Sequence, residues 1–207
     1  GSGADVYARW YANKLQQLSG RTTIVVNRPG VGGVLAAETV ARARPDGYTL
    51  WIGGAGTLAS APWLFKKPTI DPKKDFVYIS TLLGQAFILS VDSQTPYKTV
   101  AELTAAMKTK KDKASYATPN NSSTILAELY KQAAGLETTQ VNYRTSADFL
   151  NDMSSGRIDW VMADPVFALA RFAEGKMRPL GVSTGKRISA VKDIPTLHEN
   201  AEFIKIK

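Results

Sequence analysis

The chain has 207 residues, a net charge of +8, no cysteine and one histidine, His198, and 44% of its residues are hydrophobic. This composition suits one large domain or two small lobes with a buried core, and it excludes a disordered or fibrous chain. The lack of cysteine excludes disulfides, thiolate metal sites and cysteine nucleophiles, and a single histidine argues against a His-dependent triad. No apolar run approaches the roughly 18 residues of a membrane span. These features favour an α/β protein that binds a ligand.

The first part of the chain alternates between helical and extended patterns. Asp5 can cap a helix that Gly20 closes, and Pro62 interrupts a later helical segment. The expected helices cover residues 5–18, 34–44 and a short stretch after 53–57, and the expected strands cover residues 23–27, 48–52 and 76–83.

The second part repeats this alternation with clearer signals. Thr99 and Glu102 match a capping box, Asp164 precedes a proline at a first helical position, and Thr145 or Ser146 is expected to cap another helix. The expected strands cover residues 87–91, 114–118, 139–143, 158–163 and 178–183, and the expected helices cover residues 99–107, about 121–135, about 146–156 and 165–175.

Strands that alternate with helices of about ten residues predict parallel βαβ units whose sheet is covered on both faces. Two such series, before and after about residue 80, favour two α/β lobes over one continuous sheet. Small or capping residues open five helices, at residues 1–5, 53–57, 119–123, 144–146 and 164–165. Free backbone N–H groups and the positive helix end at such junctions attract anions. Together with the net positive charge, this pattern favours a protein that binds small anions.

The alternative from another class is a nucleotide-dependent α/β enzyme. Gly54, Gly56 and Ala59 match the G-x-G-x-x-A dinucleotide fingerprint after an expected strand. The fingerprint needs a long helix, which Pro62 interrupts, and an acidic residue at the end of a second strand, whereas Asp75 lies in an expected loop. Binding of NAD or ATP would separate this alternative from a carboxylate-binding protein.

The basic residues do not form a nucleic-acid signature. Lys108, Lys110, Lys111 and Lys113 follow an expected helix, where cations suit the negative end of the helix dipole. No aromatic residues are interleaved with them, as they would be in a nucleic-acid surface. We therefore expect a solvated helix end and no nucleic-acid partner.

Several sequence blocks occur together in order along nearly the whole chain. They are VNRPG at residues 26–30 with Gly32 and Gly33, RPDGYTL at 44–50, DPKKDF at 71–76, YAT at 116–118, YRTS at 143–146, GRID at 156–159, AEGKMRPL at 173–180 and DIPT at 193–196. In these blocks the chain resembles the Bug (TctC-like) family, the periplasmic solute-binding proteins of tripartite tricarboxylate transporters. The resemblance implies a two-lobed Venus-flytrap fold and a periplasmic protein that is not an enzyme.

The resemblance also implies a ligand and partners. Family ligands are di- and tricarboxylates, acidic amino acids and aromatic acids, held in the cleft between the lobes without a cofactor or a metal. Carried over by position, the ligand-binding residues are Gly3, Ala4, Asp5, Ala55, Gly56 and Thr57 in lobe one and Thr118, Asn121, Ser122, Ser123, Tyr143, Thr145 and Asp164 in lobe two. The implied protein is a monomer that serves membrane transporter subunits, or alternatively a sensor kinase.

The expected lobe boundaries follow the same resemblance. Lobe one is expected at residues 1–83 plus 187–207 and lobe two at residues 84–186, with hinges near 80–86 and 181–190. The family has a strand before the glycine loop at residues 1–5 and continues well past residue 196, so we expect lobe one to be incomplete. Thr124 stands where the family often has a histidine, which bears on the choice of ligand.

Overall fold

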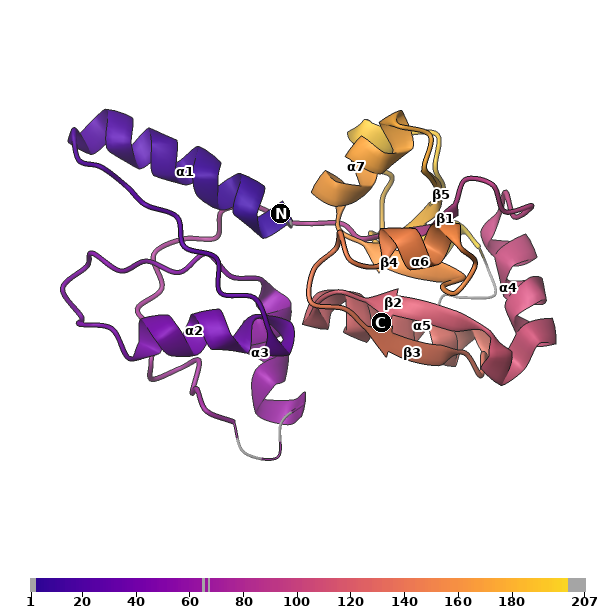
Figure 1. Cartoon of the computed structure of the whole chain (residues 1–207), viewed down its shortest axis with the longest axis horizontal. Helices are drawn as coiled ribbons and strands as arrows, with labels where there is room; N and C mark the ends of the chain where they lie inside the picture. Colours follow the sequence, from indigo (N-terminus) through magenta and orange to yellow (C-terminus); the bar gives the residue numbers. More distant parts are fainter. Residues whose placement is uncertain (1–2, 65, 67, 201–207) are drawn as a thin grey trace.

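The computed structural model describes residues 3–64, 66 and 68–200. It contains two units joined by an extended segment (Figure 1). The first unit, lobe one below, holds α1 (Gly3–Ser19), the 3₁₀ turn η1 (Val31–Gly33), α2 (Val34–Ala41) and α3 (Ala55–Leu64). The second unit, lobe two below, holds the sheet. The expected division at residues 83/84 stays a proposal, whereas residues 187–200, expected in lobe one, contact lobe two and are described with it.

Lobe two is a five-stranded sheet with helices on both faces, in the strand order β3-β2-β4-β1-β5. Its elements are β1 (Ile88–Asp92), α4 (Val100–Lys110), η2 (Lys111–Lys113), β2 (Ser115–Thr118), α5 (Asn121–Ala134), β3 (Thr139–Asn142), α6 (Leu150–Ser154), β4 (Trp160–Ala163), α7 (Pro165–Ala173), β5 (Met177–Val182), η3 (Ser189–Val191) and η4 (Leu197–Glu199). All five strands expected after residue 84 are confirmed.

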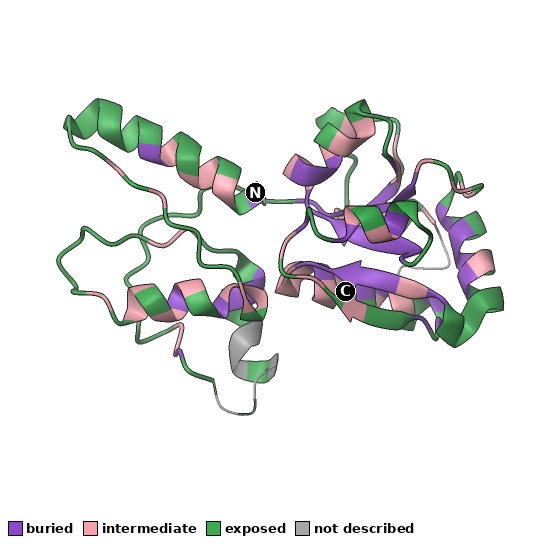
Figure 2. Ribbon diagram, viewed as in Figure 1, coloured by how far each residue is buried: buried purple, intermediate pink, exposed green. Residues whose placement is uncertain are grey.

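The core of lobe two divides into two clusters because side chains alternate across each strand. On one face, Trp160 stacks on Tyr116 with ring centroids 4.6 Å apart and meets Tyr130 edge-on at 5.1 Å, under α4 and α5. On the other face, Phe149 and Phe167 pack with residues of β1 and β4 under α6 and α7. Figure 2 shows the inner strands β1, β2 and β4 as mostly buried, whereas the edge strand β3 is mostly exposed.

The sheet is mixed, which corrects the expectation of purely parallel units. β2 runs parallel to β3 and β4, but β1 runs antiparallel to both β4 and β5. Ile88, at the start of β1, pairs with Ala163 and Val182, which end β4 and β5. The chain enters lobe two at the edge that faces lobe one, so β1 must run away from that edge while its neighbours run towards it.

Lobe one differs most from the expectation. No strand is formed in the described residues before Ile88, so the strands expected at 23–27, 48–52 and 76–83 are wrong for this structure. These segments are extended but lie outside any ladder, and Ile24 is 79% and Val77 93% exposed. A strand is stable only when a neighbour pairs with its backbone. The small core here consists of Val34, Ala37 and Ile70.

Local helix signals are mostly confirmed. Thr99 and Glu102 form the capping box of α4, and the side chain of Asp164 accepts from Phe167 N to cap α7. Three expectations fail. Asp5 lies inside α1, which begins at Gly3, so it does not cap that helix. The helix α3 continues two residues past Pro62, and α6 begins only at Leu150, since Thr145 and Ser146 lie in a preceding turn.

After β5 the described chain stays against lobe two. Val182 N donates to Pro195 O at 3.0 Å, and Val182 forms a bridge with Thr196. Ile188, Val191 and Ile194 pack on the core cluster under α7. The described part of the segment assigned to lobe one after residue 187 therefore contacts lobe two.

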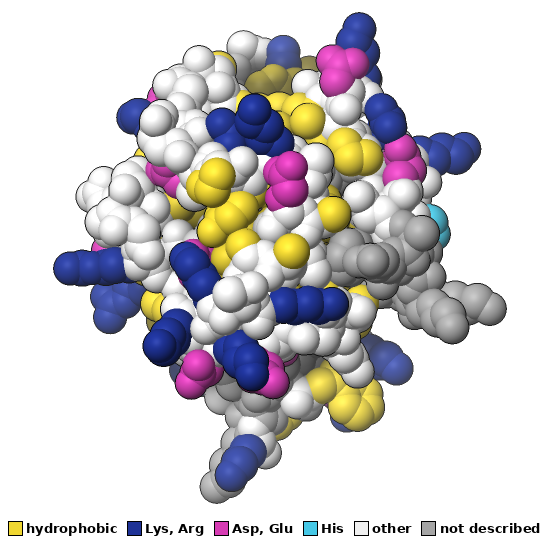
Figure 3. Space-filling model, turned by 90° about the vertical axis from the view of Figure 1, so that its right-hand side faces the viewer, with side chains coloured by type: hydrophobic (Ala, Val, Ile, Leu, Met, Phe, Trp, Pro, Cys, Tyr) yellow, Lys and Arg dark blue, Asp and Glu magenta, His cyan; other side chains and the backbone are white. Residues whose placement is uncertain are grey.

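The face of the molecule at the lobe-two end shows no concentrated charge among the described residues. Seen from the end that lies beyond lobe two, Lys and Arg side chains are scattered among Asp and Glu (Figure 3). Among the described residues, no helix is long and apolar enough to cross a bilayer.

Candidate ligand-binding site where the lobes meet

The first contact between the lobes joins the N-terminal turns of α3 and α5 (Figure 1). Gly56, buried in the first turn of α3, lies so close to α5 that a Cβ on it would be 2.3 Å from Ser122 Oγ and 2.7 Å from Ser122 N. Gly32, in the loop before α2, approaches Asn121 in the same way, because a Cβ there would be 1.8 Å from Asn121 Oδ1. Two expected site residues of lobe two thus face glycines of lobe one.

A hydroxyl fixes the lobe-one side of this contact. Thr57 is buried, and its Oγ1 donates to Gly32 O at 2.8 Å, which ties the glycine loop to the first turn of α3. Gly32 and Gly33 have φ values of 61° and 95°, a conformation that favours glycine. The loop can therefore turn sharply enough to present its backbone to α5.

On the lobe-two side, α5 begins with its capping bonds satisfied. Asn120 Oδ1 accepts from Ser123 N at 2.9 Å, and Ser123 Oγ donates to Met162 O at 2.7 Å, so Ser123 faces the interior of the lobe. The Nδ2 group of Asn121 is buried and finds no acceptor among the described residues. A buried amide donor without an acceptor is costly, and a negatively charged ligand oxygen would satisfy it.

The second contact joins the starts of α1 and α7. Asp164 is buried; its Oδ1 accepts from Phe167 N at 3.0 Å and its Oδ2 accepts from Ser146 Oγ at 3.0 Å. A Cβ on Gly3 would lie 2.5 Å from Asp164 Oδ1. Tyr7, one turn further along α1, has its pKa raised by burial and by the charge of Asp164. Two donors of lobe two thus hold the carboxylate of Asp164 in place beside the start of α1.

Other expected site residues use their polar groups elsewhere. Tyr143 Oη donates to Asp152 Oδ2 at 2.7 Å, and burial together with that carboxylate raises the pKa of Tyr143 to about 12. Thr118 Oγ1 donates to Asn142 Oδ1 at 2.8 Å. Asp5 accepts from Asn27 and Arg9, and these two bonds lower its pKa.

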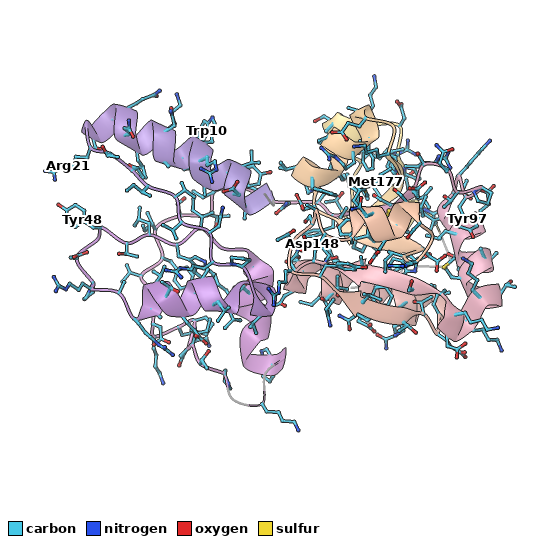
Figure 4. All side chains as sticks on the ribbon, viewed as in Figure 1. Trp10, Arg21, Tyr48, Tyr97, Asp148 and Met177 are labelled. Atoms are coloured by element: carbon cyan, nitrogen blue, oxygen red, sulfur yellow. The ribbon has the colours of Figure 1, made fainter. Side chains whose placement is uncertain are left out.

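The remaining three expected residues lie at the margins of the site. Ala4 and Ala55 are exposed at the starts of α1 and α3. Thr145 N donates to Asp148 Oδ2 at 2.9 Å, and Figure 4 places Asp148 on the edge of lobe two that faces lobe one. These residues are near the junction, but the structure shows no side chain of theirs pointing into it.

The sequence reasoning missed three residues that contribute to the junction. Gly32 contacts Asn121, Ser146 holds Asp164, and Tyr7 lies near Asp164. The cluster of glycines at residues 30–33 just before a helix was a usable signal for the first. For Ser146, the sequence suggested a helix cap, and only the fold brings it to Asp164.

The arrangement suits anion binding. Helices from both lobes direct their N-terminal N–H groups and positive dipole ends to the same junction. The described residues contain no group of three or more His, Cys, Asp or Glu side chains that could hold a metal. Residues 54–59 open α3 but follow extended chain and no strand, so the dinucleotide fingerprint lacks its strand.

Two surface cavities lie away from this junction. One of about 400 Å³ is on lobe one and one of about 300 Å³ is on lobe two. They are lined by Asn27, Arg28, Pro29, Leu35, Glu38, Thr39 and Arg42, and by Leu126, Tyr130, Ser183, Thr184, Gly185, Leu197 and His198. None of these lining residues was expected in the site.

A lobe with a five-stranded sheet meets a lobe whose described regular structure is helical, and similar folds are those of two-lobed periplasmic binding proteins. The model of the tripartite tricarboxylate transporter family receptor, TctC, matches residues 7–205. The chain therefore belongs to that family, and the resemblance inferred from the sequence blocks is confirmed.

Individual relatives agree with this assignment. The chain is 33% identical over 202 residues to a UPF0065 protein of Bordetella bronchiseptica, a match that covers 96% of the chain and 59% of the relative. Three solved structures are similar: the periplasmic binding protein BugD (27% identity, TM-score 0.91), MatC of Rhodopseudomonas palustris with bound malate (28%, 0.90) and an R. palustris protein with adipate (29%, 0.89). The matches cover 98%, 98% and 96% of this chain and 68%, 70% and 67% of those chains. The chain thus spans about three fifths of the length of the curated relative.

Proposed function

We propose that this chain captures a small carboxylate between its two lobes, in the periplasm, and delivers it to a tripartite tricarboxylate-type transporter. One observation carries the proposal: the N-terminal turns of α3 and α5 come from different lobes and meet at Gly56 and Ser122, beside the buried Nδ2 of Asn121, which has no acceptor in the part of the chain that the structure describes. Family membership supports the same function, and two similar structures are described with malate and with adipate, both dicarboxylates.

The chemistry of capture follows from the helix ends. The positive dipole ends of α3 and α5 favour a carboxylate, although some first-turn N–H groups already donate within their own lobe, Thr57 N to Gly54 O in α3 and Ser123 N to Asn120 Oδ1 in α5. Asn121 Nδ2 adds a side-chain donor. Asp164 is negative but already accepts from Phe167 N and Ser146 Oγ, so it orders the start of α7 and limits where a ligand carboxylate fits.

Lobe closure would couple capture to delivery. A ligand that bonds to α3 and to α5 at once stabilises the arrangement in which the lobes touch, and a transporter subunit can recognise that arrangement. A sensor kinase could read the same closed form, so the role in signalling is the alternative to transport.

The test is isothermal titration of the chain with malate, adipate, succinate, citrate and glutamate, with the diamide of adipate as a neutral control. At least one acid should bind and the diamide should not, because the helix N-termini favour negative charge. NAD and ATP serve as further arms. Binding of NAD or ATP without any carboxylate would contradict the proposal and favour the nucleotide alternative.

The matched variants are Asn121→Ala, which removes the buried donor, and Asn13→Ala, which removes an exposed asparagine of α1. Loss of one hydrogen bond to a charged ligand should weaken binding by roughly tenfold or more, since such bonds contribute about 1.5–3 kcal/mol. Asn13→Ala should bind like the wild type. Equal affinity of Asn121→Ala and wild type would remove Asn121 from the site.

A further inference from the structure

At three places a glycine of lobe one lies against lobe two. Gly56 faces Ser122, Gly32 faces Asn121 and Gly3 faces Asp164, and each pair joins a lobe-one backbone to the start of a lobe-two helix. The three glycines belong to three different segments, namely the first turn of α3, the loop before α2 and the start of α1.

Gly56 is the most restrictive of the three. A Cβ there would meet the backbone nitrogen of Ser122 at 2.7 Å and its Cα at 3.1 Å, besides Oγ at 2.3 Å. A side-chain oxygen can rotate away, but the backbone of a capped helix cannot. Around Gly32 the closest atoms all belong to the Asn121 side chain, which can move more easily.

The conformation of Gly56 does not itself require glycine. Its φ is not positive, unlike that of Gly32, and it lies inside a helix where alanine is the more favourable residue. The folding of lobe one would therefore tolerate alanine at this position. Only the approach of α5 opposes it.

We infer that Gly56 sets how far the two lobes can close, and that a side chain at this position would hold the lobes apart and lower the affinity for the ligand. The inference rests on the proposed function for its effect on binding, but its effect on the lobe arrangement does not depend on any ligand. If the closed form falls to a tenth of the molecules, the apparent affinity falls about tenfold.

The absence of cysteine makes the lobe arrangement directly measurable. Cysteines introduced as Arg42→Cys at the C-cap of α2 and Lys108→Cys on α4, both exposed positions, carry one spin label on each lobe. Pulsed electron–electron resonance then gives the distance distribution between lobes with and without malate or adipate. Gly56→Ala is compared in this background with Gly54→Ala, since a Cβ on Gly54 meets no described atom within 4 Å.

The expected result is a shift to longer inter-lobe distances in Gly56→Ala and the wild-type distribution in Gly54→Ala. Gly56→Ala should also bind the carboxylate about tenfold more weakly, with a melting temperature no lower than that of the wild type. A Gly56→Ala distribution that matches the wild type overturns the inference, whatever the affinity. A longer distance in Gly56→Ala combined with a wild type that binds no carboxylate would leave the inference standing and refute the proposed ligand.

Discussion

The hydroxyl of Tyr143 donates its proton to a carboxylate of its own lobe, that of Asp152, so this proton is not available to a ligand. With this bond formed, the ring of Tyr143 meets the ring of Phe149 edge-on at the lobe-two core, and the ring centroids are 6.1 Å apart. Asn121 differs in that its amide donor is buried and unpaired among the described residues. At the residue scale, the two side chains should therefore respond differently to removal of their polar groups.

We predict that Tyr143→Phe keeps the carboxylate affinity and changes the alkaline stability. Burial and Asp152 raise the pKa of Tyr143 from 10.0 to about 12, so the folded state favours the neutral phenol. The resulting stabilisation is complete below the unfolded pKa and is lost as the pH rises from about 10 to about 12. Urea unfolding of wild type and Tyr143→Phe at several pH values across this range measures it.

In that experiment the wild type should lose stability more steeply than Tyr143→Phe. At neutral pH the variant should be less stable by about 1 kcal/mol, the usual contribution of such a hydrogen bond. Tyr130, whose pKa burial also raises to about 12, is present in both proteins and provides the common background. Parallel pH profiles would mean that the bond to Asp152 does not form.

At the element scale, two adjacent residues at the start of α5 have different expected roles, one in stability and the other in binding. Asn120 caps the helix through Ser123 N, whereas Asn121 opens its first turn. We predict that Asn120→Ala lowers the free energy of unfolding by about 1 kcal/mol, the typical effect of losing an N-cap. Asn121→Ala should leave it nearly unchanged. Chemical denaturation of the two variants checks this, and an equal loss in both would contradict the assignment of the cap.

What could be predicted at this scale depended on how local the signal was. The caps of α4 and α7 are set by residues three positions apart, so Thr99 with Glu102 and Asp164 with Phe167 were readable from the sequence. The direction of β1 depends on where the chain enters lobe two, which no local pattern records. The same applies to the candidate site. Local signals indicated candidate residues at helix starts, but they did not indicate that the Tyr143 hydroxyl would donate to Asp152.

The whole molecule divides into a well-packed and a loosely packed half. Lobe two has two buried clusters, whereas lobe one exposes many large apolar side chains, among them Trp10, Leu18 and Trp63 (Figures 2 and 4). Short apolar runs such as residues 23–27 predicted strands here, and the pattern failed because a strand needs a paired neighbour as well as a suitable sequence. The sequence was sufficient to locate the strands of lobe two but not to predict which segments of lobe one form strands.

We predict that limited trypsin digestion cuts lobe one first. Arg21, Lys73 and Lys74 are exposed in segments without regular structure, so they reach a protease after little local opening. A fragment that begins at residue 75 should persist, and a bound carboxylate should slow the first cuts by holding the lobes together. Mass spectrometry of a time course measures this. Early cleavage at Lys131 or Arg171, in the helices α5 and α7 of lobe two, would contradict the division into halves.

The position of β1 has a mechanical consequence. The segment from lobe one continues directly into the middle of the sheet, where β1 lies between β4 and β5 and hydrogen-bonds to both. These hydrogen bonds are perpendicular to the strand. A force along the connecting segment therefore acts on all of them at once, in shear. Breaking the hydrogen bonds one at a time would need a force perpendicular to β1. When the lobes strain against each other, lobe two should therefore stay rigid, and the movement should be confined to the connection.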